Sequence, residues 1–194
     1  MLFYNKLKNN SNFAVNKKNI TMNIIKTLAL SLVLLISVNV LAQVGAVENK
    51  YAKGTNMVNL NDAKYAGMSF ENILNLYKGK VIYLDFWASW CRPCKGEMPH
   101  SLNMQKHFKG KDVVFLYLSS DRDVKAWKNS VAQLKITGEN YLVSPKVHNE
   151  YNTLFDVRYI PRYVLIDKQG NVVSATANRP SNPQSTKDIE ALLK

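Results

Sequence analysis

The chain contains little cysteine, only 2 of its 194 residues. Two cysteines cannot build a disulfide-dense scaffold, and they cannot supply a four-cysteine zinc module. Long hydrophobic runs are also missing, because the uncharged apolar run at residues 27–41 has fifteen residues and a membrane-spanning helix needs about 20. Hydrophobic residues make up 46% and charged residues 21%, which excludes a wholly disordered, collagenous or multi-span membrane chain.

Acidic residues are absent from the first 42 positions, which hold five lysines. The whole chain carries 26 Lys and Arg against 14 Asp and Glu, and its net charge of +12 would by itself suggest nucleic acid or an anionic surface. Without the first 42 residues the net charge falls to +7, so the body of the protein is only mildly basic. We therefore expect no nucleic-acid partner.

The lysine-containing start has the features of an export signal. Lys26 precedes the apolar run, and residues 40–42 (Val-Leu-Ala) offer the small side chains that a signal peptidase requires. We expect residues 1–42 to be an upstream extension and signal peptide, with Met22 as an alternative start. The mature protein is then periplasmic, whereas an uncleaved leader would anchor it in the inner membrane.

Strand and helix patterns alternate along the rest of the chain. Residues 43–66 are polar, with a short strand expected at 58–60, and the expected domain covers residues 67–194. Apolar patterns predict strands at 81–87, 113–118 and 141–143, a hairpin at 162–174, and helices near 70–77, 91–108, 124–134 and 147–155. A last helix carries Ile189 inward, with Ser185 and Asp188 spaced as a capping box. This order predicts one α/β domain with a central mixed sheet flanked by helices.

Both cysteines lie in one segment, Trp90-Cys91-Arg92-Pro93-Cys94, where a buried strand gives way to a helix. A structural staple is one interpretation, but closing so small a loop contributes only about 2 kcal/mol. A redox dithiol is favoured, because the unpaired N–H groups and dipole of a helix N-terminus lower the pKa of a thiol such as Cys91. Pro93 suits the first helical turn. Cys94 is then the shielded partner that resolves a mixed disulfide.

A metal site needs two further ligands, and His100 and His107 are the available histidines on the same predicted helix. Structural zinc sites usually take their second pair of ligands from a separate turn. We therefore expect both histidines on the surface and no bound metal. A copper or zinc carrier using Cys91, Cys94 and a histidine is the alternative from a different functional class.

Residues 85–95, Asp-Phe-Trp-Ala-Ser-Trp-Cys-Arg-Pro-Cys-Lys, resemble the active site of the thioredoxin-like superfamily, specifically its exported TlpA/ResA-type thiol-disulfide oxidoreductases. Pro99 resembles the proline of the active-site helix, and residues 76–80 resemble the lead-in to the first core strand. Residues 159–163 resemble the loop whose proline is cis. Residues 119–156 resemble the helix-and-strand insertion of the exported branch, so the resemblance implies a thioredoxin-like fold with an insertion before that loop.

The resemblance also implies a substrate-binding surface. A cis Ile160–Pro161 bond would place the loop against Cys91 and leave the Ile160 backbone open to pair with a substrate chain. An ordinary turn proline before an edge strand is the alternative. Trp90 is expected to frame the same surface, with core packing as its alternative. Arg92, between the cysteines, adds a cation that should make the couple less reducing.

Two carboxylates are candidates for proton transfer. Asp85 interrupts an apolar strand, so burial should raise its pKa and allow it to accept a proton from Cys94. The resemblance agrees, since thioredoxins carry a buried aspartate at this offset. Glu97 lies three residues after Cys94, and a glutamate there is implicated in redox chemistry in the ResA-type branch. The alternatives are a satisfied structural acid for Asp85 and a solvated helix residue for Glu97.

These features predict an exported thiol-disulfide oxidoreductase that reduces client disulfides, with the cysteine pair as its only cofactor. Reuse of the dithiol implies a membrane disulfide-reductase as electron donor, and family analogy suggests apocytochrome c as a client. We expect a monomer. An oxidase or isomerase would use the same site, because direction follows the reduction potential. A peroxidase is disfavoured, because the peroxiredoxin lead to a single cysteine is absent.

Overall fold

The structure is a computed structural model, and it describes residues 50–194. Tyr51–Lys194 form one compact unit. The expected upstream extension and signal peptide, residues 1–42, lie outside the described residues. Within the described part, no helix combines the length and the apolar character needed to cross a membrane.

One six-stranded sheet organises the described part of the chain, in the order β1-β4-β3-β2-β5-β6. Its strands are β1 (Thr55–Asn59), β2 (Val81–Trp87), β3 (Val113–Ser119), β4 (Gly138–Leu142), β5 (Arg162–Ile166) and β6 (Val172–Ser174). The helices are the short 3-10 helix η1 (Ala63–Tyr65), α2 (Phe70–Asn75), α3 (Arg92–His107), α4 (Val124–Gln133), α5 (Pro145–Phe155) and α6 (Pro183–Ala191). β1 to β4 pair in parallel, and β5 is antiparallel to β2 and β6. The predicted mixed sheet flanked by helices is therefore confirmed.

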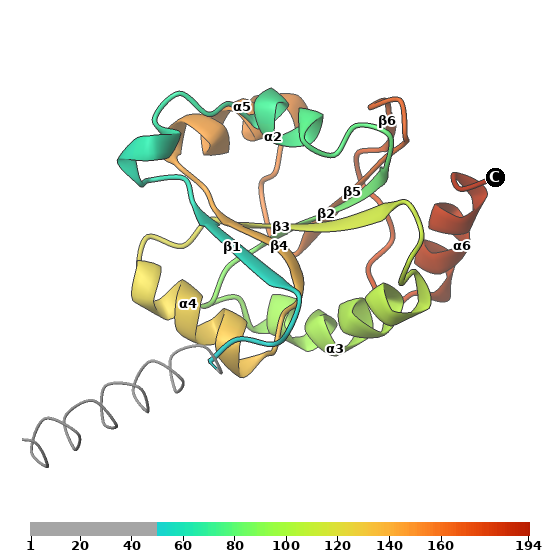
Figure 1. Ribbon diagram of the computed structural model, residues 1–194, viewed down its shortest axis with the longest axis horizontal. Helices are drawn as coiled ribbons and strands as arrows, with labels where there is room; N and C mark the ends of the chain where they lie inside the picture. The colour runs from blue at the N-terminus through green and yellow to red at the C-terminus, as the bar shows by residue number, and fades with distance from the viewer. Residues whose placement is uncertain (1–49) are drawn as a thin grey trace, which may run out of the picture. The chain divides into compact units, whose positions relative to one another are not determined.

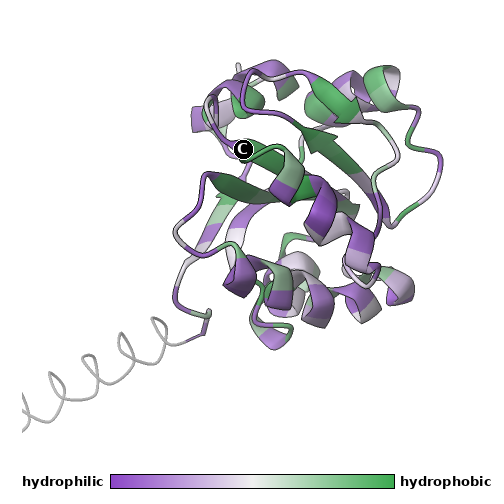
Figure 2. Ribbon diagram, turned by 90° about the vertical axis from the view of Figure 1, so that its right-hand side faces the viewer, coloured by the Kyte–Doolittle hydropathy of each residue, from purple (hydrophilic) through white to green (hydrophobic). Residues whose placement is uncertain are grey.

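Helices cover both faces of this sheet, with α2 and α5 on one side and α3 and α4 on the other (Figure 1). Every residue of β2 is buried, and its side chains alternate between the two faces. Val81, Tyr83 and Trp87 pack in the core beneath α3, α4 and α6, whereas the intervening apolar residues pack in the core beneath α2 and α5. The strands accordingly form the hydrophobic centre seen in Figure 2. A large apolar side chain buried in either core contributes about 1.5–3 kcal/mol.

The sheet begins earlier than the expected domain boundary at residue 67. β1 pairs with β4 from Thr55 to Asn59, so part of the polar segment expected at residues 43–66 forms an edge strand of the sheet. Within β1 only Val58 is buried, and Leu60 is buried just beyond it. The strand expected at 58–60 therefore differs from β1 in its bounds. An edge strand buries few side chains and leaves only a weak apolar pattern in the sequence.

The N-terminus of α6 also differs from the expectation. The predicted capping box of Ser185 and Asp188 is wrong, because the helix begins at Pro183 and its N-cap is Asn182, whose side chain accepts from the N–H of Gln184. Ser185 lies inside the helix and donates its hydroxyl hydrogen to the Asn182 carbonyl at 2.6 Å. Proline at the first helical position starts the helix one turn earlier than the box would.

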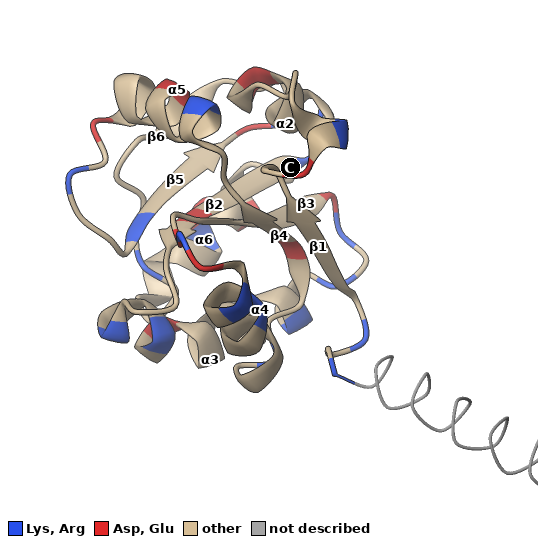
Figure 3. Ribbon diagram, turned by 90° about the vertical axis from the view of Figure 1, so that its left-hand side faces the viewer, with Lys and Arg blue, Asp and Glu red and all other residues tan. Residues whose placement is uncertain are grey.

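Charged side chains lie on several elements of the surface. In Figure 3, Lys and Arg are spread over helices and loops, with Asp and Glu between them. A hydrogen bond between His107 Nε2 and the Glu190 carboxylate, 2.7 Å apart, joins α3 to α6.

Candidate active site

The two cysteines form a disulfide where β2 turns into α3. Cys91 is the N-cap of α3, and its sulfur accepts a hydrogen bond from the backbone N–H of Cys94 at 3.2 Å. Pro93 occupies the first turn, as expected. Of the two residues only Cys91 keeps any exposure, 4% against 0% for Cys94. Cys91 is therefore the less buried cysteine of the pair.

The position of Cys91 determines which chemistry its sulfur favours. An N-cap side chain normally supplies an oxygen that accepts from the free N–H groups of the first turn. After reduction, the same N–H groups and the positive end of the α3 dipole would favour a thiolate at Cys91. The exposed cation of Arg92 follows directly in the chain. These features suit a nucleophilic sulfur at the surface end of α3.

The loop before β5 has the backbone conformation that the resemblance implied. The Ile160–Pro161 peptide bond is cis, and Ile160 packs against the core cluster that contains both cysteines. Two large aromatic side chains next to these segments are exposed: Trp90, which precedes Cys91, at 67%, and Tyr159, which precedes Ile160, at 71%. Tyr159 was not among the expected site residues, although exposed aromatic residues commonly mark binding surfaces.

Asp85 is buried beneath α3. The alternation of β2 places it on the same face as Tyr83 and Trp87, which pack in the core with Cys94. Neither carboxylate oxygen has a hydrogen-bond partner among the described residues, so a satisfied structural acid does not fit. Burial raises the pKa of Asp85 well above its ordinary value, and the charge of Glu97 raises it further. The expected direction of this shift is found.

Buried tyrosines surround Asp85 on the neighbouring strands. Tyr163 is its partner in β5 and Tyr117 its partner in β3. Burial raises the pKa of both phenols, and the charge of Asp85 adds to the rise. The Tyr117 hydroxyl is hydrogen-bonded to Ser101 and Gln105, whereas the Tyr163 hydroxyl has no partner among the described residues. Asp85 therefore lies in a buried layer where no basic side chain of the described residues is paired with it.

Glu97 is buried rather than solvated, with 8% of its surface exposed. One carboxylate oxygen accepts from the backbone N–H of Ser181 at 2.9 Å, and the other accepts from the Ser181 hydroxyl at 3.0 Å. The guanidinium of Arg179 lies 3.5 Å from the carboxylate. Sequence reasoning missed Arg179 and Ser181, because the hydrogen-bonded residues are 84 positions apart and no local pattern connects them.

The loop that carries Trp90 is fixed from the side by Asp121. Its carboxylate accepts from the backbone N–H of Ser89 at 2.9 Å, from the Ser89 hydroxyl at 2.6 Å and from the Ser119 hydroxyl at 2.6 Å. This network ties the end of β3 to the segment between β2 and Cys91. Sequence reasoning missed this residue also, since an aspartate after a strand is an ordinary loop feature.

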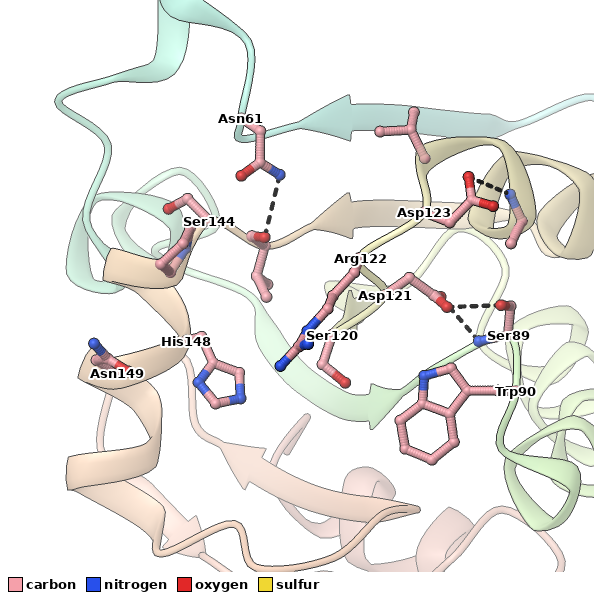
Figure 4. Close-up of a pocket in the computed structure, with 14 residues that line it drawn as sticks. Asn61, Ser89, Trp90, Ser120, Asp121, Arg122, Asp123, Ser144, His148 and Asn149 are labelled. Carbon is pink, nitrogen blue, oxygen red and sulfur yellow. Dashed lines mark hydrogen bonds between the residues drawn. The ribbon is translucent and has the colours of Figure 1, made fainter.

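A cavity of about 970 Å³ opens beside Trp90. It lies at the carboxyl ends of the parallel strands, where α4 and α5 leave the sheet toward opposite faces, a common place for ligands in α/β folds. Arg122 and His148 line it from the two sides, and in Figure 4 Arg122 lies between Trp90 and His148. Neither cysteine lines this cavity.

Metal ligands are not gathered anywhere in the described residues, where no group of three or more His, Cys, Asp and Glu could hold an ion. His100 and His107 are both exposed on α3, as expected, and His107 is paired with Glu190. Nothing in this part of the chain therefore favours the metal-carrier alternative.

Comparison with known proteins assigns the fold to a family. A thioredoxin-like family model matches residues 79–172. A crystal structure of a protein from Bacteroides vulgatus assigned as a thiol-disulfide oxidoreductase is 39% identical, with a TM-score of 0.56 over 62% of this chain and 83% of that one. The chain belongs to the thioredoxin-like family. The expected resemblance is thereby confirmed, and the structure of this thioredoxin-like chain contains both the cis Ile160–Pro161 bond and the Cys91–Cys94 disulfide.

Among curated relatives, the thioredoxin-like chain is similar to thiol-disulfide oxidoreductases called ResA. It is 31% identical to ResA of Bacillus thuringiensis subsp. konkukian over 118 residues, 61% of this chain and 64% of that protein. It is 34% identical to ResA of Bacillus subtilis over 96 residues, 50% of this chain and 52% of that protein. The chain thus matches less than two thirds of the length of these relatives.

Proposed function

We propose that this protein is a thiol-disulfide oxidoreductase in which Cys91 is the nucleophile and Cys94 the resolving cysteine. One observation carries the proposal: the Cys91–Cys94 disulfide has its less buried cysteine, Cys91, at the N-cap of α3, and its second cysteine is fully buried one turn further on. A structural staple would not need one sulfur at the surface end of a helix dipole. Similarity to the ResA proteins supports the same chemistry.

The exchange takes place in two steps. In the first, the Cys91 thiolate attacks one sulfur of a client disulfide, so that a Cys91–client bond forms and the client's own S–S bond breaks. The released client thiolate takes a proton from water. In the second, Cys94 loses its proton, attacks the Cys91 sulfur and displaces the other client sulfur, which is also protonated. The client gains two electrons, and the protein ends in the disulfide form that the structure holds.

Asp85 is the proton acceptor in the second step. Cys94 is fully buried, so water has little access to its proton, whereas Asp85 lies on the sheet face that packs in the same core. A carboxylate whose pKa is raised by burial binds a proton far more readily than an ordinary aspartate does. Cys94 can therefore transfer its proton as it attacks.

The client is a polypeptide held over Cys91. Its backbone would pair with the half-buried Ile160–Pro161 loop, and the exposed Trp90 and Tyr159 would contact its side chains. The cavity beside Trp90 has room for a further segment of the same chain. No cofactor other than the cysteine pair takes part in this scheme.

The physiological direction that we propose is reduction of client disulfides in the periplasm, with apocytochrome c as a client. The apolar run of residues 27–41 supports export, and the names of the ResA relatives support membership of this exported branch. Outside the cytoplasm the dithiol must be recharged, which calls for a membrane disulfide-reductase as electron donor. The protein would act as a monomer. An oxidase or isomerase with the same site would be distinguished by a high reduction potential.

Trapping of the mixed disulfide tests the proposal. Cys94→Ser should hold clients on Cys91 as stable mixed disulfides, because the second step is lost. Cys91→Ser should trap none and should abolish exchange. Non-reducing electrophoresis after acid quenching of expressing cells measures both, and the Cys91→Ser/Cys94→Ser protein is the matched control. Trapping by Cys91→Ser in place of Cys94→Ser would contradict the assignment of roles.

A further inference from the structure

The segment between β6 and α6 holds Glu97 through three contacts. The Ser181 N–H and hydroxyl donate to its two carboxylate oxygens at 2.9 and 3.0 Å, and the Arg179 guanidinium lies 3.5 Å away. Glu97 is one of the five buried residues of α3, as is Cys94 one turn before it. A surface segment therefore supplies the partners of a carboxylate on the buried side of the active-site helix.

This segment is itself fixed to the sheet beneath the site. The Ala177 N–H donates to the Tyr163 carbonyl at 3.0 Å, and the Tyr83 hydroxyl donates to the Asn178 carbonyl at 2.5 Å. Pro180 is buried between Arg179 and Ser181. The segment that carries the two residues in contact with Glu97 is thus anchored to β2, which carries Asp85, and to β5, which pairs with it.

Arg179 can influence Asp85 through Glu97, because it pairs with the carboxylate that acts on Asp85. Glu97 is the charged group that raises the pKa of Asp85, after burial itself. Arg179 acts in the opposite sense on the same layer, because it lowers the pKa of Tyr163 while Asp85 and Glu97 raise it. The charged group that acts on Asp85 itself is Glu97 on α3. The tyrosines of the same layer are Tyr83 on its own strand and Tyr117 and Tyr163 on the adjacent strands. Asp188 on α6 acts on Tyr83, and Arg179 acts on Tyr163. Arg179 is the one cation among them.

We propose that Arg179 and Ser181 are positioning residues, which hold the Glu97 carboxylate in place and partly neutralise it, and thereby set how readily Asp85 takes the proton of Cys94. The inference rests on the proposed function, since it concerns the second step of the exchange. It also separates the two carboxylates: Glu97 is a fixed anion committed to three contacts, and Asp85 is the unpaired acid that exchanges a proton.

The proposal predicts that loss of Arg179 and loss of the Glu97 charge shift the pKa of Asp85 in opposite directions. Without Arg179 the charge of Glu97 is less neutralised, so the pKa of Asp85 rises further and its basic form appears only at higher pH. Removal of the charge of Glu97 lowers the pKa of Asp85, so the basic form appears at lower pH. In a protein that already lacks the charge of Glu97, loss of Arg179 should not shift the pKa of Asp85 any further.

The experiment follows the second step against pH. Reduced protein is mixed with the chromogenic disulfide 5,5′-dithiobis(2-nitrobenzoate), where the first released thiolate reports the attack by Cys91 and the second reports resolution by Cys94. We expect Arg179→Gln to raise the pH midpoint of the second phase by roughly half a unit, the size expected of a partly exposed ion pair. Ser181→Ala should shift it the same way by less, because the backbone N–H remains. Glu97→Gln should lower it, and Arg179→Gln/Glu97→Gln should match Glu97→Gln.

The outcomes separate the inference from the proposed function. Arg158→Gln, which changes an exposed arginine paired with Asp156, is the control and should leave the midpoint unchanged. An unmoved midpoint in both Arg179→Gln and Ser181→Ala overturns the inference, as does a shift by Arg179→Gln that persists in the Glu97→Gln background. A wild-type protein that releases no second thiolate overturns the proposed function instead. If Arg179→Gln does not fold, the direction in which Ser181→Ala shifts the pH midpoint of the second phase decides the test.

Discussion

Asp85 and Cys91 belong to the same short segment, but their surroundings favour opposite charge states. Asp85 is in the middle of β2, where the sheet and α3 exclude water and neither oxygen has a hydrogen-bond partner among the described residues. Cys91 lies six residues further on, at the N-terminus of α3, where an N–H already donates to its sulfur. The first environment favours the neutral acid and the second favours the anion.

Replacement of Asp85 should reveal what its burial costs the folded protein. Because the folded-state pKa of Asp85 is raised, the folded protein retains this proton to a higher pH than the unfolded chain does. Its contribution to stability is therefore fully present below the unfolded pKa of about 3.9 and is lost as pH rises through the folded value. Asp85→Asn has no such proton, so its stability relative to the wild type should increase as pH rises from about 4.

Urea unfolding of the disulfide form between pH 4 and pH 8 measures this difference. Asp112→Asn, at an exposed aspartate, is the matched control for the substitution itself. A constant difference between Asp85→Asn and the wild type across this range would mean that Asp85 titrates normally in the folded state.

At the scale of elements, the sequence predicts best where burial leaves a periodic pattern. β2 was predicted with its observed bounds because both of its faces are covered and it is apolar apart from one aspartate. The bounds of β1 and its place inside the domain cannot be predicted in this way, because it is an edge strand with one buried residue. The N-cap of α6 is predicted wrongly, because the sequence offers both Asn182, the true N-cap, and Ser185 three residues later.

Gly138 at the start of β4 has a requirement that no sequence pattern revealed. Its φ of +81° is in the region that side chains rarely adopt, and an added Cβ would lie 3.0 Å from the Phe115 carbonyl oxygen on β3. Gly170 has a similar φ of +91° but open space around it. We expect Gly170→Ala to destabilise the protein by about 1 kcal/mol through backbone strain alone.

Gly138→Ala should cost at least twice as much, because β3 and β4 must also move apart. Urea unfolding of both variants measures the two costs, and neither substitution touches the cysteines. Equal losses of stability for Gly138→Ala and Gly170→Ala would show that the contact with Phe115 carries no energy.

At the scale of the whole molecule, the parts of the site come from distant segments that meet only in the folded sheet. The sequence predicted Cys91, Cys94 and the Pro161 loop because each belongs to a motif with a local pattern. The partners of Glu97 and the Asp121 network could not be found in this way, since they join residues that only the strand order brings together. Long-range polar contacts are therefore what the structure adds to the sequence.

The strand order also predicts where the domain can be cut. A chain that starts at residue 50 keeps β1, whereas one that starts at residue 67 loses it and leaves β4 as an unprotected edge. Because Val58 and Leu60 are then also lost from the core, we expect the shorter chain to be less stable by about 3 kcal/mol or more. Urea unfolding of the two chains compares them directly. Equal stability would mean that β1 is dispensable for the fold.

The central claim is that the N-terminus of α3 makes Cys91 a nucleophile. Its most direct test is the rate of alkylation of Cys91 by iodoacetamide across a pH series, in reduced Cys94→Ser protein so that only one thiol reacts. The account predicts a midpoint clearly below the value of about 8.5 that a free cysteine shows. A midpoint at or above that value would contradict it, because the sulfur would then gain nothing from its place at the head of the helix.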